Sequence, residues 1–172
     1  MKAEYSTPFD FRQPIVGVMG SGKEEHGELA GPLGEWIGAN GCHLLTGGGA
    51  GVMASVSRAF HSVEGRDGRS IGILPGSPGA GGRGSPGGYP NHWVEIPIRT
   101  HLPLSGERGR DPMSRNHLNV LSADVIVALP GGAGTRSEVE LALEYGRPLI
   151  CWLGEEGDIA GFPDGAAPLA GS

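Results

Sequence analysis

The chain has 172 residues, a formal net charge of −6 and a sequence pI near 5.5. This length is enough for one domain with a hydrophobic core, and the acidic balance argues against a nucleic-acid or membrane-surface partner. No apolar run approaches the roughly 18 residues that a membrane span needs, and the polar, mixed first residues show no signal peptide. These features predict a cytoplasmic protein.

Two cysteines and many glycines mark the composition. Cys42 and Cys151 each lie beside a predicted strand, so we expect them to be buried and reduced. No Cys/His spacing typical of a metal site accompanies them, and we expect no metal. Glycine contributes 33 residues, which cluster directly after apolar runs, where turns and phosphate-binding loops occur.

The first predicted strand follows an N-terminal arm of residues 1–13 and covers Ile15 to Met19. Gly20-Ser21-Gly22-Lys23 comes next, and we call residues 20–22 the first glycine turn. The full Gly-x-x-x-x-Gly-Lys-Ser/Thr spacing is missing, which excludes a Walker-type nucleotide triphosphatase. We expect Lys23 to be a solvated loop lysine.

A helix should follow, with one face formed by Leu29, Leu33, Trp36 and Ile37. Pro32 interrupts this pattern, so the helix either starts late or is kinked there. Asn40-Gly41 is a helix stop signal.

A second strand (43–46), a second glycine turn (47–51) and a second helix starting at Val52 repeat this order, and Ile71 to Leu74 forms a third strand. The alternation predicts an α/β fold, a Rossmann-like, doubly wound and mostly parallel sheet, in a single domain spanning 14–154.

Residues 76–91 are rich in Gly, Pro and Ser and predict a flexible loop. A fourth strand is expected at 93–98, where Pro97 indicates an edge position. The arginine-rich segment 99–112 is expected to be a mobile loop beside the site. A helix over 113–123 should turn Leu118 and Leu121 inward and carry Arg115 near its start.

The segment around residues 124–138 is the most informative. Val125 to Leu129 is an apolar run typical of a strand buried on both faces. Pro130 ends it, the third glycine turn (131–134) follows, and a helix is expected over 134–145. Residues 148–153 form a last strand, and the tail from 155 to 172 is expected to be flexible.

A strand, a glycine turn and a helix N-terminus together form an anion site, because free N–H groups and the helix dipole point at one spot. Thr135 can cap the helix or bond a phosphate oxygen, and Glu138 lies one turn later. The alternative is a structural capping box, Thr-x-x-Glu.

Ligands of open α/β sheets bind at the carboxyl ends of the strands, where all three glycine turns should meet. We therefore expect a phosphate-bearing small molecule there. The candidate phosphate-binding and ligand-binding residues in the three turns are Gly20, Ser21, Gly22, Gly47, Gly48, Gly131, Gly132, Ala133, Gly134 and Thr135.

The run Pro130-Gly131-Gly132-x-Gly134-Thr135-x-x-Glu138 resembles the signature of the Lonely Guy (LOG) family, also labelled "lysine decarboxylase-like". Arg115 stands fifteen residues before Pro130, as in that family, although Asn116 replaces the lysine that usually follows. The resemblance implies hydrolysis of the N-glycosidic bond of nucleoside 5′-monophosphates without a required cofactor. It assigns Arg115 and Glu138 as catalytic residues and implies a homodimer, or higher homo-oligomer, through helices 113–123 and 134–145.

Other stretches resemble a sister group, the molybdenum cofactor carrier proteins, which bind a phosphate-bearing pterin without turning it over. The matching segments are Gly17–Lys23, Leu44–Gly48, Gly51–Met53 and Arg115-x-x-x-Asn119-x-Leu121-Ser122. This resemblance adds Asn119 to the candidate ligand-binding residues.

Two functions remain open at this point. A carboxylate beside the sugar would stabilise the positive charge of N-glycosidic cleavage, which favours a phosphoribohydrolase. The alternative is a non-catalytic carrier of a molybdopterin-type cofactor, since the two groups share a fold.

Overall fold

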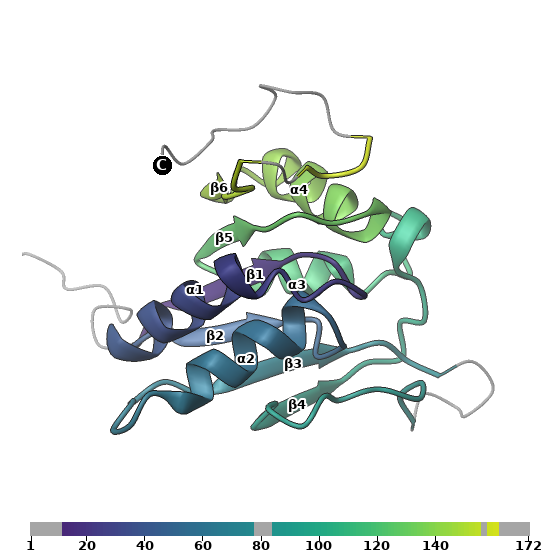
Figure 1. Ribbon diagram of the computed structural model, residues 1–172. Helices are drawn as coiled ribbons and strands as arrows, with labels where there is room; N and C mark the ends of the chain where they lie inside the picture. The colour runs from purple at the N-terminus through teal and green to yellow at the C-terminus, as the bar shows by residue number, and fades with distance from the viewer. Residues whose placement is uncertain (1–11, 78–83, 156–157, 162–172) are drawn as a thin grey trace, which may run out of the picture.

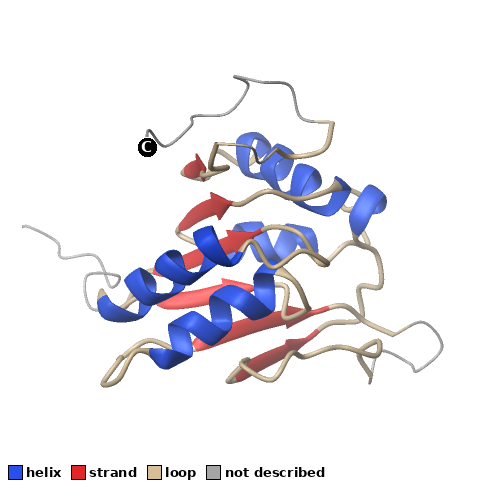
Figure 2. Cartoon of the chain, in the orientation of Figure 1, coloured by secondary structure: helices blue, strands red, loops and turns tan. Residues whose placement is uncertain are grey.

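A computed structural model describes residues 12–77, 84–155 and 158–161 of the chain. Its elements are β1 (Ile15–Met19), α1 (Gly27–Ala39), β2 (His43–Thr46), α2 (Val52–Ser62), β3 (Ser70–Leu74), β4 (Ile96–Arg99), the 3₁₀ turn η1 (Gly106–Arg108), α3 (Asn116–Ser122), β5 (Val125–Ala128), α4 (Ala133–Glu144) and β6 (Leu149–Cys151). Figure 1 traces them in chain order and Figure 2 separates helices from strands.

The strands form one sheet in the order β4-β3-β2-β1-β5-β6, and every pairing is parallel. The predicted Rossmann-like α/β fold is therefore confirmed. The chain builds outward from β1 to β4 and then returns to the other side of β1 with β5. This reversal of direction between β1 and β5 is the topological switch point at which α/β sheets bind ligands.

The sheet is covered on both faces, as its continuous apolar strands predict. On one face, α1 and α2 pack over β1 and β2, with Ile37 and Phe60 fully buried against Leu44. On the other face, α3 and α4 supply Val120 and Val139 to a second core around Ile126. Figure 1 shows the two helix layers on opposite sides of the strands.

Helix α1 differs from its prediction in two ways. It begins at Gly27, ahead of Pro32, and continues past the proline, so it does not start late. Trp36 is 57% exposed instead of facing the core. The four apolar residues of the predicted face cover a wider part of the helix surface than the part that is buried. Trp36 lies at the edge of that face, outside the buried part.

Helix α3 begins at Asn116, three residues after the predicted start, and the predicted inward orientation of Leu118 and Leu121 is wrong. Both leucines are exposed, while Asn116, Asn119 and Val120 are buried. The buried side of this helix is thus largely polar. Asn116 lines the ligand cavity described below, and Asn119 donates a hydrogen bond to Glu138, which also lines it.

Strand β4 is an edge strand, as Pro97 predicts, although it starts at Ile96 instead of residue 93. Cys42 and Cys151 are buried free thiols, also as predicted. Most of the predicted N-terminal arm, residues 78–83 of the predicted loop, and residues 162–172 of the predicted tail lie outside the described residues. Among the helices that are described, none has the length and apolar character of a membrane span.

Candidate functional site

The three glycine turns meet through backbone hydrogen bonds. The amide of Ser21 donates to the carbonyl oxygen of Pro130 at 3.0 Å, and the amide of Val52 donates to the carbonyl oxygen of Ser21 at 2.9 Å. Gly51 has φ +63°, and a Cβ there would overlap the backbone of residues 21–23. Glycine at 51 is therefore what permits the second turn to approach the first.

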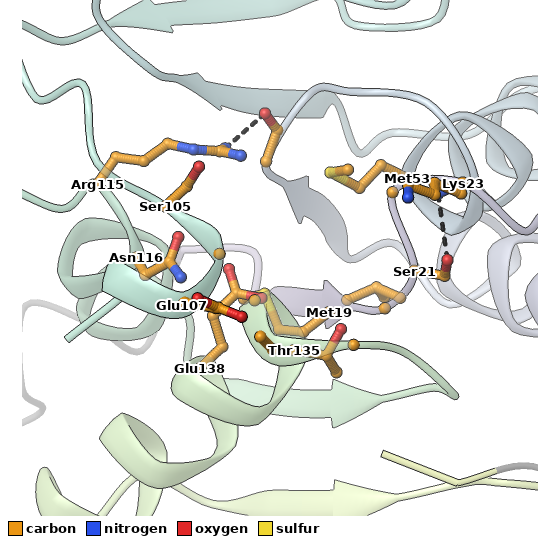
Figure 3. A pocket seen from close by; sticks show the side chains of 18 of the residues that line it. Met19, Ser21, Lys23, Met53, Ser105, Glu107, Arg115, Asn116, Thr135 and Glu138 are labelled. Carbon is orange, nitrogen blue, oxygen red and sulfur yellow. Dashed lines mark hydrogen bonds between the residues drawn. The ribbon is translucent and has the colours of Figure 1, made fainter. Parts of the chain in front are cut away.

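A cavity of about 530 Å³ opens where these turns meet, at the carboxyl ends of the strands. Figure 3 shows Arg115 and Met53 along one side and Thr135 and Glu138 along the other. The lining residues are Val18, Met19, Gly20, Ser21, Gly22, Lys23, Gly47, Met53, Tyr89, Ser105, Gly106, Glu107, Arg115, Asn116, Gly132, Ala133, Gly134, Thr135 and Glu138. The volume is that of a typical small-molecule site.

The N-terminus of α4 supplies an anion site on this cavity. Its cap residue is Gly132, no side chain caps it, and the first turn contains no acidic residue. The first amide that bonds within the helix is that of Arg136, which donates to the carbonyl oxygen of Gly132 at 3.0 Å. The amides of Ala133, Gly134 and Thr135 precede it and have no intrahelical acceptor. They can hold a phosphate with the help of the helix dipole.

The capping-box alternative is wrong. In a capping box, the Ser or Thr stands at the cap and the Glu three residues into the helix. Here Gly132 is the cap and Thr135 is buried inside the first turn. Glu138 lies a full turn deeper, beyond the reach of the cap amide.

Arg115 stands at the start of α3 and is only 5% exposed. Its Nη1 donates to the carbonyl oxygen of Gly47 at 2.6 Å and also to that of Ile73. Its Cζ lies 5.5 Å from the centre of the Tyr89 ring. A Cβ at position 47 would overlap the guanidinium, so glycine there allows Arg115 to reach the end of β2. Burial lowers the pKa of Arg115, opposed by the nearby Glu138 and Tyr89, and the group stays charged because arginine is not deprotonated in proteins.

Glu138 projects from α4 and is 8% exposed. Its Oε1 accepts a hydrogen bond from Nδ2 of Asn119 at 2.8 Å. Burial raises the pKa of Glu138, while the Asn119 hydrogen bond and the charge of Arg115 act against that rise. Among the residues that line the site, Arg115 is thus a buried cation and Glu138 a buried carboxyl group, beside an anion-binding helix terminus.

Most predicted site residues line this cavity, namely Gly20, Ser21, Gly22, Gly47, Arg115, Gly132, Ala133, Gly134, Thr135 and Glu138. Three do not. Gly48 faces Leu74, Gly131 is enclosed by Thr135 and Ser21, and Asn119 lies behind Glu138. These three support the site from behind its surface.

Several lining residues were not predicted. Lys23, which we expected to be a solvated loop lysine, is exposed and also lines the cavity. Tyr89 reaches the cavity because the nearby Asn91 is bonded to the second glycine turn. The backbone amide of Asn91 donates to the carbonyl oxygen of Gly48 at 2.7 Å, and its Nδ2 donates to the carbonyl oxygen of Gly49 at 2.8 Å. Glu107 comes from η1. Loop residues of this kind carry no periodic signal, and only long-range contacts bring them to the site.

The C-terminal segment also supports the third glycine turn. The amide of Gly131 donates to the carbonyl oxygen of Asp158 at 3.0 Å, and the amide of Ala160 donates to that of Gly131 at 2.9 Å. Ile159 between them is 3% exposed. Residues 158–161, which belong to the tail predicted to be flexible, are therefore packed against the third glycine turn.

No group of three or more His, Cys, Asp or Glu side chains in the described ranges could hold a metal ion. The amides and cations that line the site can bind an anion, and the buried carboxyl group of Glu138 can form a hydrogen bond to a ligand.

The chain is similar to a protein family and to several known proteins. Residues 13–162 match the model of the SLOG cluster4 family. The molybdenum cofactor binding protein from Rippkaea orientalis is 37% identical, with a TM-score of 0.66 over 84% of this chain and 79% of that one. The Moco carrier protein from Chlamydomonas reinhardtii is 36% identical, with a TM-score of 0.62 over 81% and 76% of the two chains. An uncharacterized protein of Archaeoglobus fulgidus is 30% identical over 134 residues, or 77% of this chain and 75% of its own.

Proposed function

The chain belongs to the SLOG cluster4 family and has a LOG-like nucleotide-binding fold, and we propose that it binds a phosphate-bearing pterin of the molybdenum cofactor type. The observation that carries this proposal is the 37% identity, over 84% of the chain, to a protein described as molybdenum cofactor binding. The family match over residues 13–162 spans all the segments that line the cavity.

The geometry supports a ligand with one phosphate end and one flat end. The phosphate fits the amides of Ala133, Gly134 and Thr135, since a helix N-terminus without an acidic residue attracts anions. Arg115 and Lys23 add positive charge to the same cavity. Met53 and Tyr89 offer an apolar thioether and an aromatic ring against which a planar heterocycle can pack.

The experiment is to produce the protein in a host that makes molybdenum cofactor and to record pterin fluorescence after acid oxidation. We expect a co-purified pterin, and saturable binding when the cofactor is added to pterin-free protein. Arg115→Gln, which removes the charge at the cavity wall, is the matched variant and should retain less pterin. Absence of pterin in the wild type, together with no binding of added cofactor, would overturn the proposal.

A second candidate is hydrolysis of nucleoside 5′-monophosphates, supported by the presence of Arg115 and Glu138 on one cavity. Asn116 weakens this candidate. It lines the cavity where LOG members usually carry a lysine, and its Nδ2 donates to Oγ of Ser137 at 2.8 Å. The site therefore has one cation fewer for a phosphorylated sugar.

The hydrolase candidate is tested by incubation with AMP, CMP, GMP, UMP and a cytokinin nucleotide, followed by chromatography for the free base. Base released by the wild type in proportion to enzyme concentration supports hydrolysis. No release from any of the five, at high enzyme concentration, removes this candidate and leaves the binding role.

A further inference from the structure

Asn119 lies outside the cavity, but its side chain contacts Glu138, whose buried carboxyl group lines the cavity. We propose that Asn119 is a positioning residue, which fixes one oxygen of the Glu138 carboxyl group and leaves the other available to the cavity. This inference deepens the proposed function and rests on it for the identity of the ligand.

The contact is a single hydrogen bond between two helices. Asn119 on α3 is fully buried and donates from Nδ2 to Oε1 of Glu138 on α4 at 2.8 Å. Its Oδ1 is also buried and has no hydrogen-bond partner within the described residues. An unpaired buried acceptor costs free energy, and a leucine of similar size would avoid that cost. The contribution of Asn119 therefore lies in its bond to Glu138.

That bond determines which oxygen of Glu138 the ligand meets. Oε1 is occupied by Asn119, and no other hydrogen bond to the carboxylate occurs in the described part of the chain. Since Glu138 lines the cavity, Oε2 is the oxygen available to a ligand. In the ionised form of Glu138 this oxygen only accepts hydrogen bonds, so it selects for a hydroxyl or N–H donor on the bound molecule.

The surroundings of Glu138 make this assistance necessary. Burial raises the pKa of Glu138, and the hydrogen bond from Asn119 and the charge of Arg115 oppose it. The other titratable groups on the cavity are Lys23 from the first turn, Glu107 from η1 and Tyr89 from the loop before β4. Loss of the Asn119 donor would leave Arg115 as the main group that favours the ionised form.

The first test needs no ligand. The titration of Glu138 is followed by NMR of the ¹³C-labelled side-chain carboxyl in the wild type and in Asn119→Leu, which removes the donor and keeps the approximate size. We expect Glu138 to titrate at higher pH in Asn119→Leu. Ser137→Ala is the matched control, because it breaks the other hydrogen bond between these helices, from Asn116 to Ser137, and should leave the titration of Glu138 unchanged. An unchanged titration in Asn119→Leu would overturn the proposal.

The second test uses a swapped pair, which keeps the experiment decisive if Asn119→Leu does not fold. The double variant Asn119→Asp/Glu138→Gln restores a hydrogen bond between α3 and α4 but moves the carboxylate away from the cavity. We expect a melting temperature near that of the wild type and an affinity for molybdopterin or AMP lowered by roughly tenfold or more, the scale of a hydrogen bond to a charged group. Wild-type affinity in the swapped pair would overturn the proposal. If the wild type binds neither probe, the proposed function fails, while the NMR titration still decides the role of Asn119.

Discussion

Arg115 and Glu138 reach the same cavity from α3 and α4, but Arg115 donates to the carbonyl oxygens of Gly47 and Ile73 and Glu138 accepts from Asn119. Each group is therefore fixed by its own partner. They influence each other's pKa through their charges, but no ion pair between them is found among the described residues, and both line the cavity.

Glu138→Gln separates the two candidate functions. In a binding protein, the carboxylate contacts the ligand in its stable bound state. We then expect Glu138→Gln to bind the ligand more weakly than the wild type, and neither the wild type nor the variant to turn it over. In a hydrolase, the charge acts on the transition state, and turnover should fall by roughly two to four orders of magnitude with little change in affinity. Calorimetry with the cofactor and with AMP, beside chromatography for free base, distinguishes these outcomes.

Glu138→Gln should also change the pH dependence of stability. The pKa of Glu138 is raised in the folded protein, so its contribution to stability is present below the unfolded-state pKa and is lost as pH rises through the folded-state pKa. Glutamine does not titrate. We therefore expect the variant to melt above the wild type at neutral and alkaline pH, with the difference shrinking on acidification. A difference that is constant with pH would contradict this assignment.

Arg115→Ala should lower both stability and affinity. The carbonyl oxygens of Gly47 and Ile73 lose their donor, which costs about 1–3 kcal/mol if they remain unsatisfied. The cavity also loses a cation that favours the phosphate. Urea unfolding and calorimetry measure the two effects, and a variant that loses neither would show that Arg115 has no role here.

Gly47→Ala tests the close approach of Arg115 to β2. The added methyl group would overlap the guanidinium, so Arg115 must leave its two carbonyl partners, and ligand affinity should fall by roughly tenfold or more. Gly27→Ala is the control, because a Cβ at position 27 of α1 meets no atom within 4 Å outside its chain neighbours and its own helix backbone. That control should keep the stability and the ligand affinity of the wild type.

We also propose that the exposed leucines of α3 mediate the homodimer that resemblance to the LOG family implies. Leu118 and Leu121 are exposed on the outer side of α3, and apolar side chains of this size favour a buried interface. The double variant Leu118→Glu/Leu121→Glu should convert a dimer to a monomer in light scattering coupled to size-exclusion chromatography. A wild type that is already monomeric contradicts this proposal.

The sequence predicted the sheet and the third glycine turn because both depend on short segments with strong local signals. Val125 to Leu129 is a continuous apolar run, and the glycines after Pro130 predict a turn, which the structure forms before α4 begins at Ala133. It could not predict the orientation of α3, since hydrophobic periodicity places Leu118 and Leu121 inside. The structure buries Asn116 and Asn119 instead, because Asn116 lines the cavity and Asn119 donates a hydrogen bond to Glu138.

Tyr89 and Glu107 were missed for a different reason. Both lie in segments without regular periodicity, and their approach to the cavity depends on contacts with distant residues, such as that between Asn91 and the second glycine turn. Gly131 was predicted to bind ligand directly, whereas its amide is held by Asp158. Such long-range backbone pairing has no signature in the local sequence.

The bonds between Gly131 and residues 158–160 also set an order of events during synthesis. The third glycine turn leaves the ribosome before the segment that fastens it, so a nascent chain that ends after α4 has every lining residue of the cavity but lacks the bonds that hold Gly131. A ligand can therefore meet the fully assembled site only after residue 160 has emerged.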